Sequence, residues 1–415
     1  MEVNQTAQLT ATVTPADATE KVQWTSSNTD VATVNNTGLV TAKASGTVTI
    51  TVKNANGTKL VRCVVDVIDG YLLGRGRLYE GSASDGYITK IDSNEEKVWD
   101  KQLTRIDDNR FEDGYGPVYA ITPTSDGGYL LGRGRLYEGA ASVGYITKID
   151  SNGEKVWDKQ LKKIDDNRFE DGYGLVYAIT PTSNGGYLLG RGRLYEGSAS
   201  NGYITKIDNN GEKVWDKQLT RIDDNRFEDD YGLVYAITPT SDGGYLLGRG
   251  RLYERSASVG YITKIDSNGE KVWDKQLTRI DDNRFEDGYG PVYAITPTSD
   301  GGYLLGRGRL YEGAASVGYI TKIDSNGEKV WDKQLKKIDD NRFEDGYGLV
   351  YAITPTSNGG YLLGRGRLYE GSASNGYITK IDNNGEKVWD KQLKKIDDNR
   401  FEDGYGPVYA ICESK

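Results

Sequence analysis

The sequence contains no histidine, and it has only two cysteines and one methionine among 415 residues. Without histidine the chain cannot build an imidazole general base, a Ser–His or Cys–His nucleophile pair, or the commonest zinc ligand. Two cysteines are too few for a disulfide-rich framework or a metal cluster. We therefore predict that the chain is not an enzyme and that it holds no metal or other cofactor. The alternative is acid–base glycoside chemistry by carboxylate pairs such as Asp108 and Glu112.

Long apolar segments and an excess of positive charge are also lacking. No apolar run approaches the roughly 20 residues that span a bilayer, and no charged-then-apolar leader follows Met1. Lys and Arg number 52 against 61 Asp and Glu, which gives a formal net charge of −9 that is spread along the chain. We therefore expect no nucleic-acid partner and no membrane insertion, and we expect any export signal to lie outside this chain.

Helical periodicity of useful length is absent, whereas a repeat of 58 residues is plain. The string YLLGRGRLYE begins six times, at Tyr71, Tyr129, Tyr187, Tyr245, Tyr303 and Tyr361. Each unit contains four runs rich in Tyr, Val, Ile and Thr between turn residues, as in 72–79, 87–91, 97–103 and 117–122. Four short antiparallel strands per repeat are typical of a β-propeller blade. We predict an all-β chain in which residues 70–415 form a six-bladed β-propeller.

The repeat resembles a family of extracellular bacterial β-propellers. The strings GGYLLGRG, GYITKIDSNGEKVWDKQL and VYAITPTSDGG carry this resemblance, which covers residues 71–415. It implies that the strand before DGG is the innermost strand of a blade and that the tryptophan strand is the outermost. It also implies that the first blade combines three strands from residue 71 onward with an inner strand at 408–411, so that both chain ends close the ring.

Residues 1–69 lack this period and alternate polar and apolar residues between turn signals, which favours a small β-sandwich. The strings LTATVTPADAT and VQWTSSNTDVATVNNTGLVTAKASGTVTITV resemble the group 2 bacterial immunoglobulin-like domain. This resemblance implies an N-terminal immunoglobulin-like β-sandwich with Trp24 in its core and its first strand missing before Glu2. Members of the family occur on bacterial surface proteins, which implies an extracellular or cell-surface location.

The two cysteines occupy related places at the ends of the repeat region. Cys63 lies eight residues before Tyr71, and Cys412 lies seven residues before the position where a further repeat would begin. After ring closure both would approach the same blade junction, and we predict a disulfide between them. In the chain-entropy model so long a loop would stabilise the fold by roughly 4 kcal/mol. Free or buried thiols and an intermolecular disulfide are the alternatives.

The long segments of each repeat, residues 79–86 and 104–115 in the first, belong to one face because successive strands alternate in direction. Function commonly lies on loops that a rigid scaffold holds. These loops combine carboxylate, amide, guanidinium and aromatic groups, which suit sugar hydroxyls and pyranose faces. Our candidate ligand-binding residues are Tyr79, Asp108, Asn109, Arg110, Phe111, Glu112 and Tyr115, with the later arginines Arg168, Arg226, Arg284, Arg342 and Arg400.

The same loop residues also have a structural interpretation. Residues 107–108 would cap the loop, Arg110 would pair with Glu112 of a neighbouring blade, and Phe111 would belong to the core. Calcium at positions 107 and 109 is a further alternative, although Phe111 would stand where an oxygen ligand is required.

Two further side-chain sets recur in every repeat. Arg75 and Arg77 stand two apart on one strand and point to one face, and we predict that they form ion pairs between blades, with an anionic ligand as the alternative. Trp99 and its five counterparts follow a turn, on the strand 97–103 in the first repeat, and resemble the docking tryptophan of quinoprotein blades. We therefore predict that they pack between blades.

Six nearly identical sets of loops favour a multivalent adhesin or lectin-like module, because several weak sites on one scaffold gain avidity. Its expected partner is a glycan or a surface protein. The alternative is a structural surface or fibre subunit that self-associates through the open strand position of the N-terminal module.

Overall fold

The computed structural model consists of strands, turns and irregular segments, and none of the described residues is helical. Accordingly, no helix in this part of the chain could cross a membrane. The structure describes residues 1–14, 21–79, 82–94, 96–103, 116–135, 143–161, 174–195, 198–219, 232–251, 259–277, 290–309, 317–335, 348–357, 359–369, 372–393 and 407–414.

Contacts divide the chain into two compact units. One contains Met1–Leu72, Thr89–Asp100 and Cys412–Lys415, and the other contains Leu73–Ile88 and Lys101–Ile411. The boundary that we predict between residues 69 and 70 remains a prediction.

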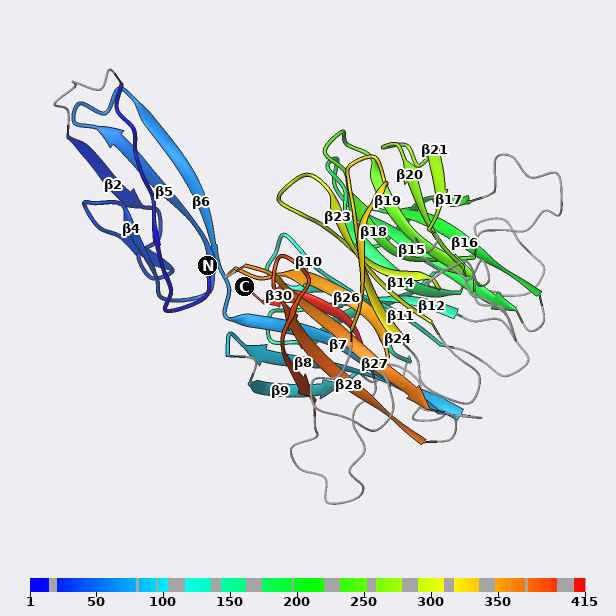
Figure 1. Ribbon diagram of the computed structural model, residues 1–415. Coiled ribbons are helices and arrows are strands. Elements are labelled where there is room, and N and C mark those ends of the chain that lie inside the picture. The colour runs from blue at the N-terminus through cyan, green and yellow to red at the C-terminus, as the bar shows by residue number, and fades with distance from the viewer. Residues whose placement is uncertain are drawn as a thin grey trace. The chain divides into compact units, whose positions relative to one another are not determined.

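The N-terminal module contains two three-stranded antiparallel sheets, of order β1-β4-β3 and β2-β5-β6 (Figure 1). Its strands are β1 (Thr6–Gln8), β2 (Val22–Ser26), β3 (Ala32–Val34), β4 (Leu39–Ala42), β5 (Gly46–Asn54) and β6 (Leu60–Val67). Alternation along these strands buries Val40, Val48 and Ile50 in one cluster, against which Trp24 packs. The predicted place of Trp24 in the core is thus confirmed.

The repeats form six four-stranded sheets within the described residues. The first strands are β10 (Val118–Pro123), β14 (Leu175–Pro181), β18 (Leu233–Pro239), β22 (Val292–Pro297), β26 (Leu349–Pro355) and β30 (Val408–Ser414). The second strands are β11 (Tyr129–Arg135), β15 (Tyr187–Tyr195), β19 (Tyr245–Arg251), β23 (Tyr303–Arg309), β27 (Tyr361–Tyr369) and β7 (Gly70–Tyr79).

The third strands are β12 (Val143–Ile149), β16 (Ser198–Ile207), β20 (Val259–Ile265), β24 (Val317–Ile323), β28 (Ser372–Ile381) and β8 (Ser82–Asp92). The fourth strands are β13 (Lys155–Gln160), β17 (Lys213–Gln218), β21 (Lys271–Gln276), β25 (Lys329–Gln334), β29 (Lys387–Gln392) and β9 (Lys97–Gln102). In the last sheet the order is β30-β7-β8-β9, so the red β30 and the blue β7 of Figure 1 join the two ends of the chain. An all-β chain with a two-sheet N-terminal module and four-stranded repeats is therefore confirmed.

One tyrosine from the first strand of each sheet meets its counterparts in the two neighbouring sheets. The six residues of this tyrosine ring are Tyr119, Tyr177, Tyr235, Tyr293, Tyr351 and Tyr409. Ring centroids lie 4.8 to 5.2 Å apart, and the contact of Tyr409 with Tyr119 closes the series. Such tilted and edge-to-face pairs are each worth about 0.5–1.5 kcal/mol beyond the area they bury.

A β-bulge directs these tyrosines toward one another. The pairing of β10 with β11 shifts register between Val118 and Ala120, which leaves Tyr119 as the extra residue. The same shift occurs in the first strands of the next four sheets. Because a bulge changes the direction of a side chain, it points each of these strand tyrosines toward the tyrosine ring.

The predicted Cys63–Cys412 disulfide is wrong, because both cysteines are free thiols. Cys63 lies on β6 with an exposed side chain, whereas Cys412 lies on β30 and is buried. Cys63 donates a hydrogen bond to the carbonyl of Val64 at 3.8 Å, and Cys412 donates one to the carbonyl of Glu413 at 3.4 Å. Sequence spacing predicted a common junction, but it could not show that one side chain faces solvent and the other the interior.

We predict that the folded protein loses stability as the pH rises above about 10, where an unfolded tyrosine ionises. Burial raises the pKa of all six ring tyrosines, and the charge of other tyrosines in the ring raises it further in five of them. The folded state therefore holds protons that the unfolded state releases, so stability is full below pH 10 and falls above it. Each ring tyrosine contributes up to about 1.4 kcal/mol per pH unit.

Urea unfolding at a series of alkaline pH values, with phenolate absorbance followed in parallel, measures this effect. Tyr235→Phe should reduce the pH slope by about one proton. Ionisation of all tyrosines near pH 10 with the fold retained would contradict the burial of the ring.

Candidate functional site

The residues that we predict to bind ligand cannot be placed. The segment 104–115, with Asp108, Asn109, Arg110, Phe111, Glu112 and Tyr115, lies outside the described residues, as do Arg168, Arg226, Arg284, Arg342 and Arg400. Tyr79 is the last residue of β7, where only the backbone is described. These assignments, and the calcium alternative at positions 107 and 109, remain predictions.

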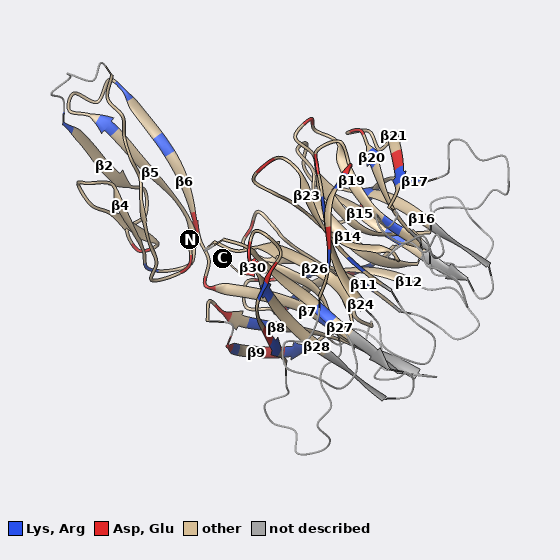
Figure 2. Ribbon diagram, in the orientation of Figure 1, with Lys and Arg blue, Asp and Glu red and all other residues tan. Residues whose placement is uncertain are grey.

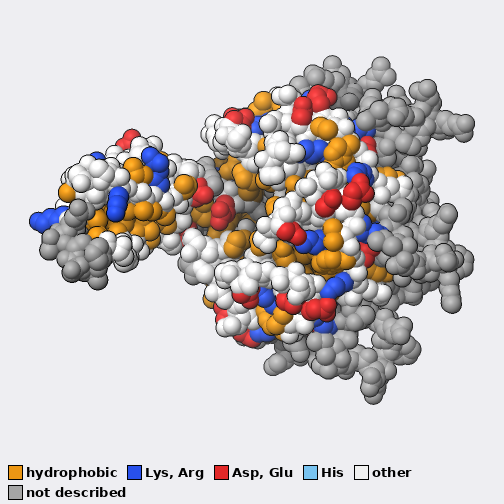
Figure 3. Space-filling model, turned by 90° about the horizontal axis from the view of Figure 1, so that it is seen from above, with side chains coloured by type: hydrophobic (Ala, Val, Ile, Leu, Met, Phe, Trp, Pro, Cys, Tyr) orange, Lys and Arg blue, Asp and Glu red, His pale blue; other side chains and the backbone are white. Residues whose placement is uncertain are grey.

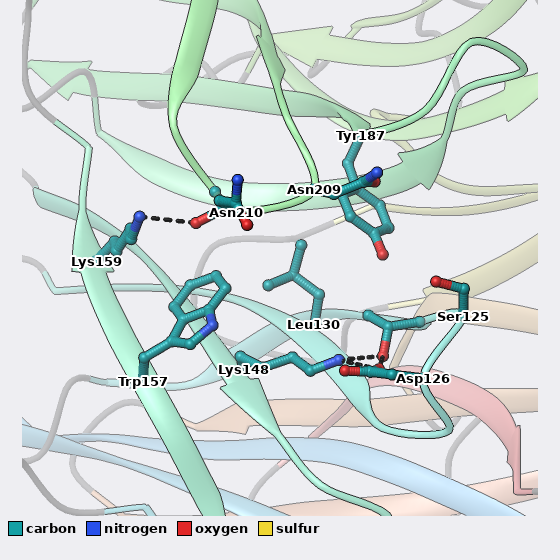
Figure 4. A pocket seen from close by; sticks show the side chains of 11 residues that line it. Ser125, Asp126, Leu130, Lys148, Trp157, Lys159, Tyr187, Asn209 and Asn210 are labelled. Carbon is teal, nitrogen blue, oxygen red and sulfur yellow. Dashed lines mark hydrogen bonds and ion pairs between the residues drawn. The ribbon is translucent and has the colours of Figure 1, made fainter.

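A cavity of about 530 Å³ lies at the opposite end of the strands, between the sheet β10–β13 and the sheet β14–β17 (Figure 4). It is formed by the tight turns and by the strand residues beside them, and not by the long loops on which we predict the site. Its lining residues are Thr124, Ser125, Asp126, Leu130, Lys148, Trp157, Lys159, Tyr187, Asn209, Asn210 and Gly211. Both sheets thus contribute to the cavity, which we call the inter-sheet pocket.

The β10–β11 turn presents a carboxylate at the rim of the inter-sheet pocket. The N–H of Thr124 donates to the carbonyl of Gly128 at 2.9 Å, and Gly127 has a φ of +87°, a conformation that favours glycine. Lys148 donates to the carboxylate of Asp126 at 2.5 Å and to the hydroxyl of Thr124. The hydrogen bond from Lys148, followed by the one from Thr124, lowers the pKa of Asp126 to about 2. Asp126 is therefore a carboxylate at neutral pH, with 68% of its side chain exposed.

Trp157 lies on the outer strand β13 and forms one wall of the inter-sheet pocket. The ammonium of Lys159 lies 5.4 Å from the centre of its ring. Lys159 also donates to the carbonyl of Asn210 at 2.7 Å and to the carboxylate of Glu212, both in the next sheet. A Cβ on Gly211 would lie only 2.8 Å from Cη2 of Trp157, so the indole packs where no side chain fits. Lysine and tryptophan together hold this wall against the neighbouring turn.

The floor and the far wall of the inter-sheet pocket are apolar apart from one hydroxyl, that of Tyr187. Leu130 is buried beneath the pocket, and Tyr187 from β15 extends beside it with 8% of its surface exposed (Figure 4). Burial, and then the charge of Asp126, raises the pKa of Tyr187, so its hydroxyl stays protonated. Asn209 accepts a hydrogen bond from the N–H of Gly186 at 2.8 Å and still offers its amide N–H₂ group.

The tryptophan–glycine contact recurs at successive junctions. The equivalent pairs are Trp215 with Gly269, Trp273 with Gly327 and Trp331 with Gly385. The lysine bond to the next turn recurs with them, from Lys217, Lys275 and Lys333. The predicted packing role of these tryptophans is confirmed at the four junctions.

The polar residues of the junctions differ in a regular way. The repeats with Asp in the first turn have Ser in the later turn, as in Asp126 with Ser151, whereas the third and sixth repeats have Asn at both places, as in Asn184 with Asn209. The contacts of Asn209 explain why the residue types in the two turns change together. Its side chain accepts a hydrogen bond from the N–H of Gly186 in the first turn. The Asp repeats hold this N–H through the aspartate itself, at 3.5 Å in the case of Asp126. Consequently, the pocket between the second and third sheets combines Asp126 with Asn209.

The first arginine of each second strand is buried, and in three sheets main-chain carbonyls accept its hydrogen bonds. Arg133 is 0% exposed and donates to the carbonyls of Leu103 and Gly116 at 3.4 Å, one at each end of the segment 104–115. Arg249 and Arg307 make the equivalent bonds. In two other sheets the arginine lies near a carboxylate of its own sheet, with Arg191 4.0 Å from Asp216 and Arg365 3.9 Å from Asp390. The predicted partners in residues 107–112 lie outside the described residues.

Residues 1–65 match the family model described as bacterial Ig-like domain (group 2), which confirms the predicted module. The lacto-N-biosidase of Bifidobacterium bifidum is 54% identical over 52 residues, 12% of this chain and 5% of that protein. The kappa-carrageenase of Pseudoalteromonas carrageenovora is 48% identical over 64 residues, 15% of this chain and 16% of that protein.

The Ig-like virion protein of Serratia phage KSP90 is 56% identical over 61 residues, 14% of this chain and 24% of that protein. The chain thus spans no more than 24% of the length of these three relatives.

The prediction that the chain is not an enzyme is wrong on this comparison. Two of the three relatives, the lacto-N-biosidase and the kappa-carrageenase, are named as enzymes. The absence of histidine removes imidazole chemistry alone, and carboxylates suffice for most glycoside hydrolysis. A histidine-free composition therefore does not separate this chain from carbohydrate-active enzymes.

We predict that Gly211→Ala destabilises the protein more than Gly127→Ala. Both glycines have a left-handed φ, +79° and +87°, so alanine costs roughly 1–2 kcal/mol at either place. Only at Gly211 would the new methyl group also meet Trp157, whereas at Gly127 nothing lies within 4 Å. Overpacking adds about 1–3 kcal/mol. Thermal and urea unfolding measure the difference, and equal losses in the two variants would contradict the packing described here.

Proposed function

We propose that this chain is an extracellular, multivalent carbohydrate-binding protein that binds sugars in its inter-sheet pockets. One observation carries the proposal: an apolar floor and two aromatic side chains, Trp157 and Tyr187, lie among hydrogen-bonding groups from two sheets. Pyranose rings offer apolar faces to such surfaces, while their hydroxyls pair with carboxylates and amides such as Asp126 and Asn209. The extracellular assignment draws support from the immunoglobulin-like module and from the named activities of the two enzyme relatives.

The proposal includes a closed six-bladed β-propeller over residues 70–415, preceded by the module of residues 1–69. Its support is the series of tyrosine contacts, which runs from Tyr119 to Tyr409 and back to Tyr119. The order β30-β7-β8-β9 adds the strand exchange that closes such rings. In this arrangement similar pockets stand at fixed spacing, and binding to a multivalent surface gains avidity.

We expect the chain to bind oligosaccharides, with lacto-N-biose and kappa-carrageenan oligosaccharides as the first probes because of the relatives' names. Ser125 is exposed at the rim of the inter-sheet pocket, so Ser125→Phe fills the pocket without replacing a core residue. Introduced at all equivalent positions, it should abolish binding on a glycan array. Val156→Phe, also placed in every repeat, is the matched control because Val156 is 55% exposed and does not line the pocket.

Arg110→Ala with its five counterparts tests the loop residues in the same assay. Loss of binding in the Ser125→Phe series alone supports the inter-sheet pocket. Loss in the arginine series alone would overturn that location and assign binding to the predicted loops. Wild-type protein that binds neither these probes nor any other glycan would overturn the function itself.

A further inference from the structure

A lysine on the third strand of each repeat sheet reaches the first turn of the same sheet. In three sheets an aspartate of that turn forms an ion pair with it at 2.5 to 2.6 Å. The pairs are Lys148 with Asp126, Lys264 with Asp242 and Lys322 with Asp300. In Figure 3 acidic and basic side chains lie next to one another on the surface of the repeats. The charge of the lysine is therefore compensated within each of these three sheets.

The sheet β14–β17 lacks this aspartate, because Asn184 stands at the same position of its first turn. The ammonium of Lys206 donates to the side-chain oxygen of Asn184 at 3.1 Å and to the carbonyl of Gly185 at 2.7 Å. It also donates to the hydroxyl of Thr182. These oxygens are neutral, and no carboxylate in the described part of the chain forms an ion pair with Lys206.

The acidic residue nearest to Lys206 along the strand does not replace the missing charge. Asp208 accepts hydrogen bonds from the main-chain N–H groups of Asn210 at 2.9 Å and Glu212 at 2.8 Å. An aspartate with the same two bonds recurs in the other repeats, as Asp150 shows. This aspartate is therefore common to all the sheets and does not distinguish one from another.

The junction of the sheet β14–β17 with the sheet β18–β21 has the same walls as the inter-sheet pocket, and we call it the Lys206 junction. Leu188, Trp215 and Tyr245 belong to one hydrophobic cluster there. They occupy the repeat positions of the leucine, the tryptophan and the tyrosine that line the inter-sheet pocket. Lys217 forms an ion pair with Glu270 across the junction. The two junctions thus share their apolar surfaces and differ in the charge of the first turn.

The Lys206 junction carries one more positive charge than the inter-sheet pocket. At the inter-sheet pocket Lys148 and Lys159 both form ion pairs with carboxylates. At the Lys206 junction Lys217 forms such a pair, whereas Lys206 meets only neutral oxygens among the described residues. Figure 2 shows charges of both signs on the strands and turns of the repeats, so an uncompensated lysine is an exception to their pattern.

The neighbouring tyrosines respond to the same difference. Burial, and then the charge of Asp126, raises the pKa of Tyr187 in the inter-sheet pocket. Burial alone raises the pKa of Tyr245 at the Lys206 junction. Burial also lowers the pKa of Lys206, because an ammonium that loses water is less stable in its charged form. An anion beside Lys206 would stabilise this charged form.

We propose that the Lys206 junction binds the anionic group of an acidic sugar, a carboxylate or a sulfate on a pyranose ring. The proposal rests on the function proposed for the inter-sheet pockets and adds the class of ligand for one of the junctions. An anionic oxygen of the sugar takes the place that the aspartate carboxylate has in the other first turns. Hydrogen bonds between ionised groups are roughly twice as strong as neutral ones, so this exchange is favourable.

The side chains around Lys206 allow such an exchange. Asn184 is exposed, and its bond to the ammonium is the longest of the three, so an anionic oxygen can displace it. The amide N–H₂ group of Asn184 is then a donor to the same anion. Ser183 and Ser267 are exposed in the two turns of the junction and add hydroxyl donors.

The test follows each junction separately in the full chain labelled with ¹⁵N-tryptophan, which gives one indole signal for each of the seven tryptophans. The probes are methyl glucoside, its uronate and its 6-sulfate, which share one ring and differ in charge. We expect the Trp215 signal to respond to an acidic probe at about tenfold lower concentration than to the neutral probe. The Trp157 signal should show no such preference, and high salt should reduce the preference at Trp215. The uronate and the sulfate distinguish the two kinds of anionic group.

Two reciprocal variants test the role of the first turn. Asn184→Asp supplies the carboxylate that the other turns have and should abolish the acidic preference at Trp215. Asp242→Asn removes the carboxylate beside Lys264 and should create an acidic preference at Trp273. Both substitutions install a residue that this chain already has at the same repeat position, so both variants should fold.

Equal responses of the Trp215 signal to the neutral and acidic probes, or no response to either, would overturn the proposal. An acidic preference that Asn184→Asp leaves unchanged would overturn the assignment to Lys206. In each of these cases the function proposed above would stand as long as the glycan array shows binding that the Ser125→Phe series loses.

Discussion

The tyrosine ring is the contact on which the arrangement of the six sheets depends. Each ring residue meets two others at 4.8 to 5.2 Å, so displacement of one sheet disturbs both of its neighbours. The ring exists because a bulge re-aims a strand residue, as at Tyr119, and burial of its phenol keeps it protonated. These contacts keep the first strands of neighbouring sheets at a constant spacing, and this spacing determines how far apart the sheets lie.

A second set of contacts holds the outer strands. Trp157 packs on Gly211 of the next sheet, and Lys159 bonds to the main chain beside it. Because each sheet is held at both its inner and its outer strand, the space between the tight turns remains open as the inter-sheet pocket. The buried Arg133 bonds to both ends of the segment 104–115 at the other end of the sheet. The proposed function and the fold thus depend on the same junctions.

Much of this fold could be predicted from the sequence, because period, turn residues and strand alternation are local properties. The four-stranded repeats were accessible in this way, whereas the joining of the chain ends and the packing role of Trp157 followed from the resemblance to known β-propeller repeats. The bulge at Tyr119 and the inter-sheet pocket were not, since both arise between sheets, although the linked Asp126–Ser151 and Asn184–Asn209 choices were a signal. The Cys63–Cys412 disulfide was wrong because spacing does not report side-chain direction, and the exclusion of enzymes was wrong because composition does not exclude carboxylate chemistry.

The central claim is that one chain binds several sugars at equivalent junctions, and native mass spectrometry of the chain saturated with an array-selected oligosaccharide tests it most directly. The account predicts a series of complexes extending to at least two bound oligosaccharides, because the combination of Asp126 with Asn209 recurs as Asp300 with Asn383. If the populations of complexes with one, two or more bound oligosaccharides follow a binomial distribution, the sites have similar affinities. Saturation at a single bound oligosaccharide would contradict the account.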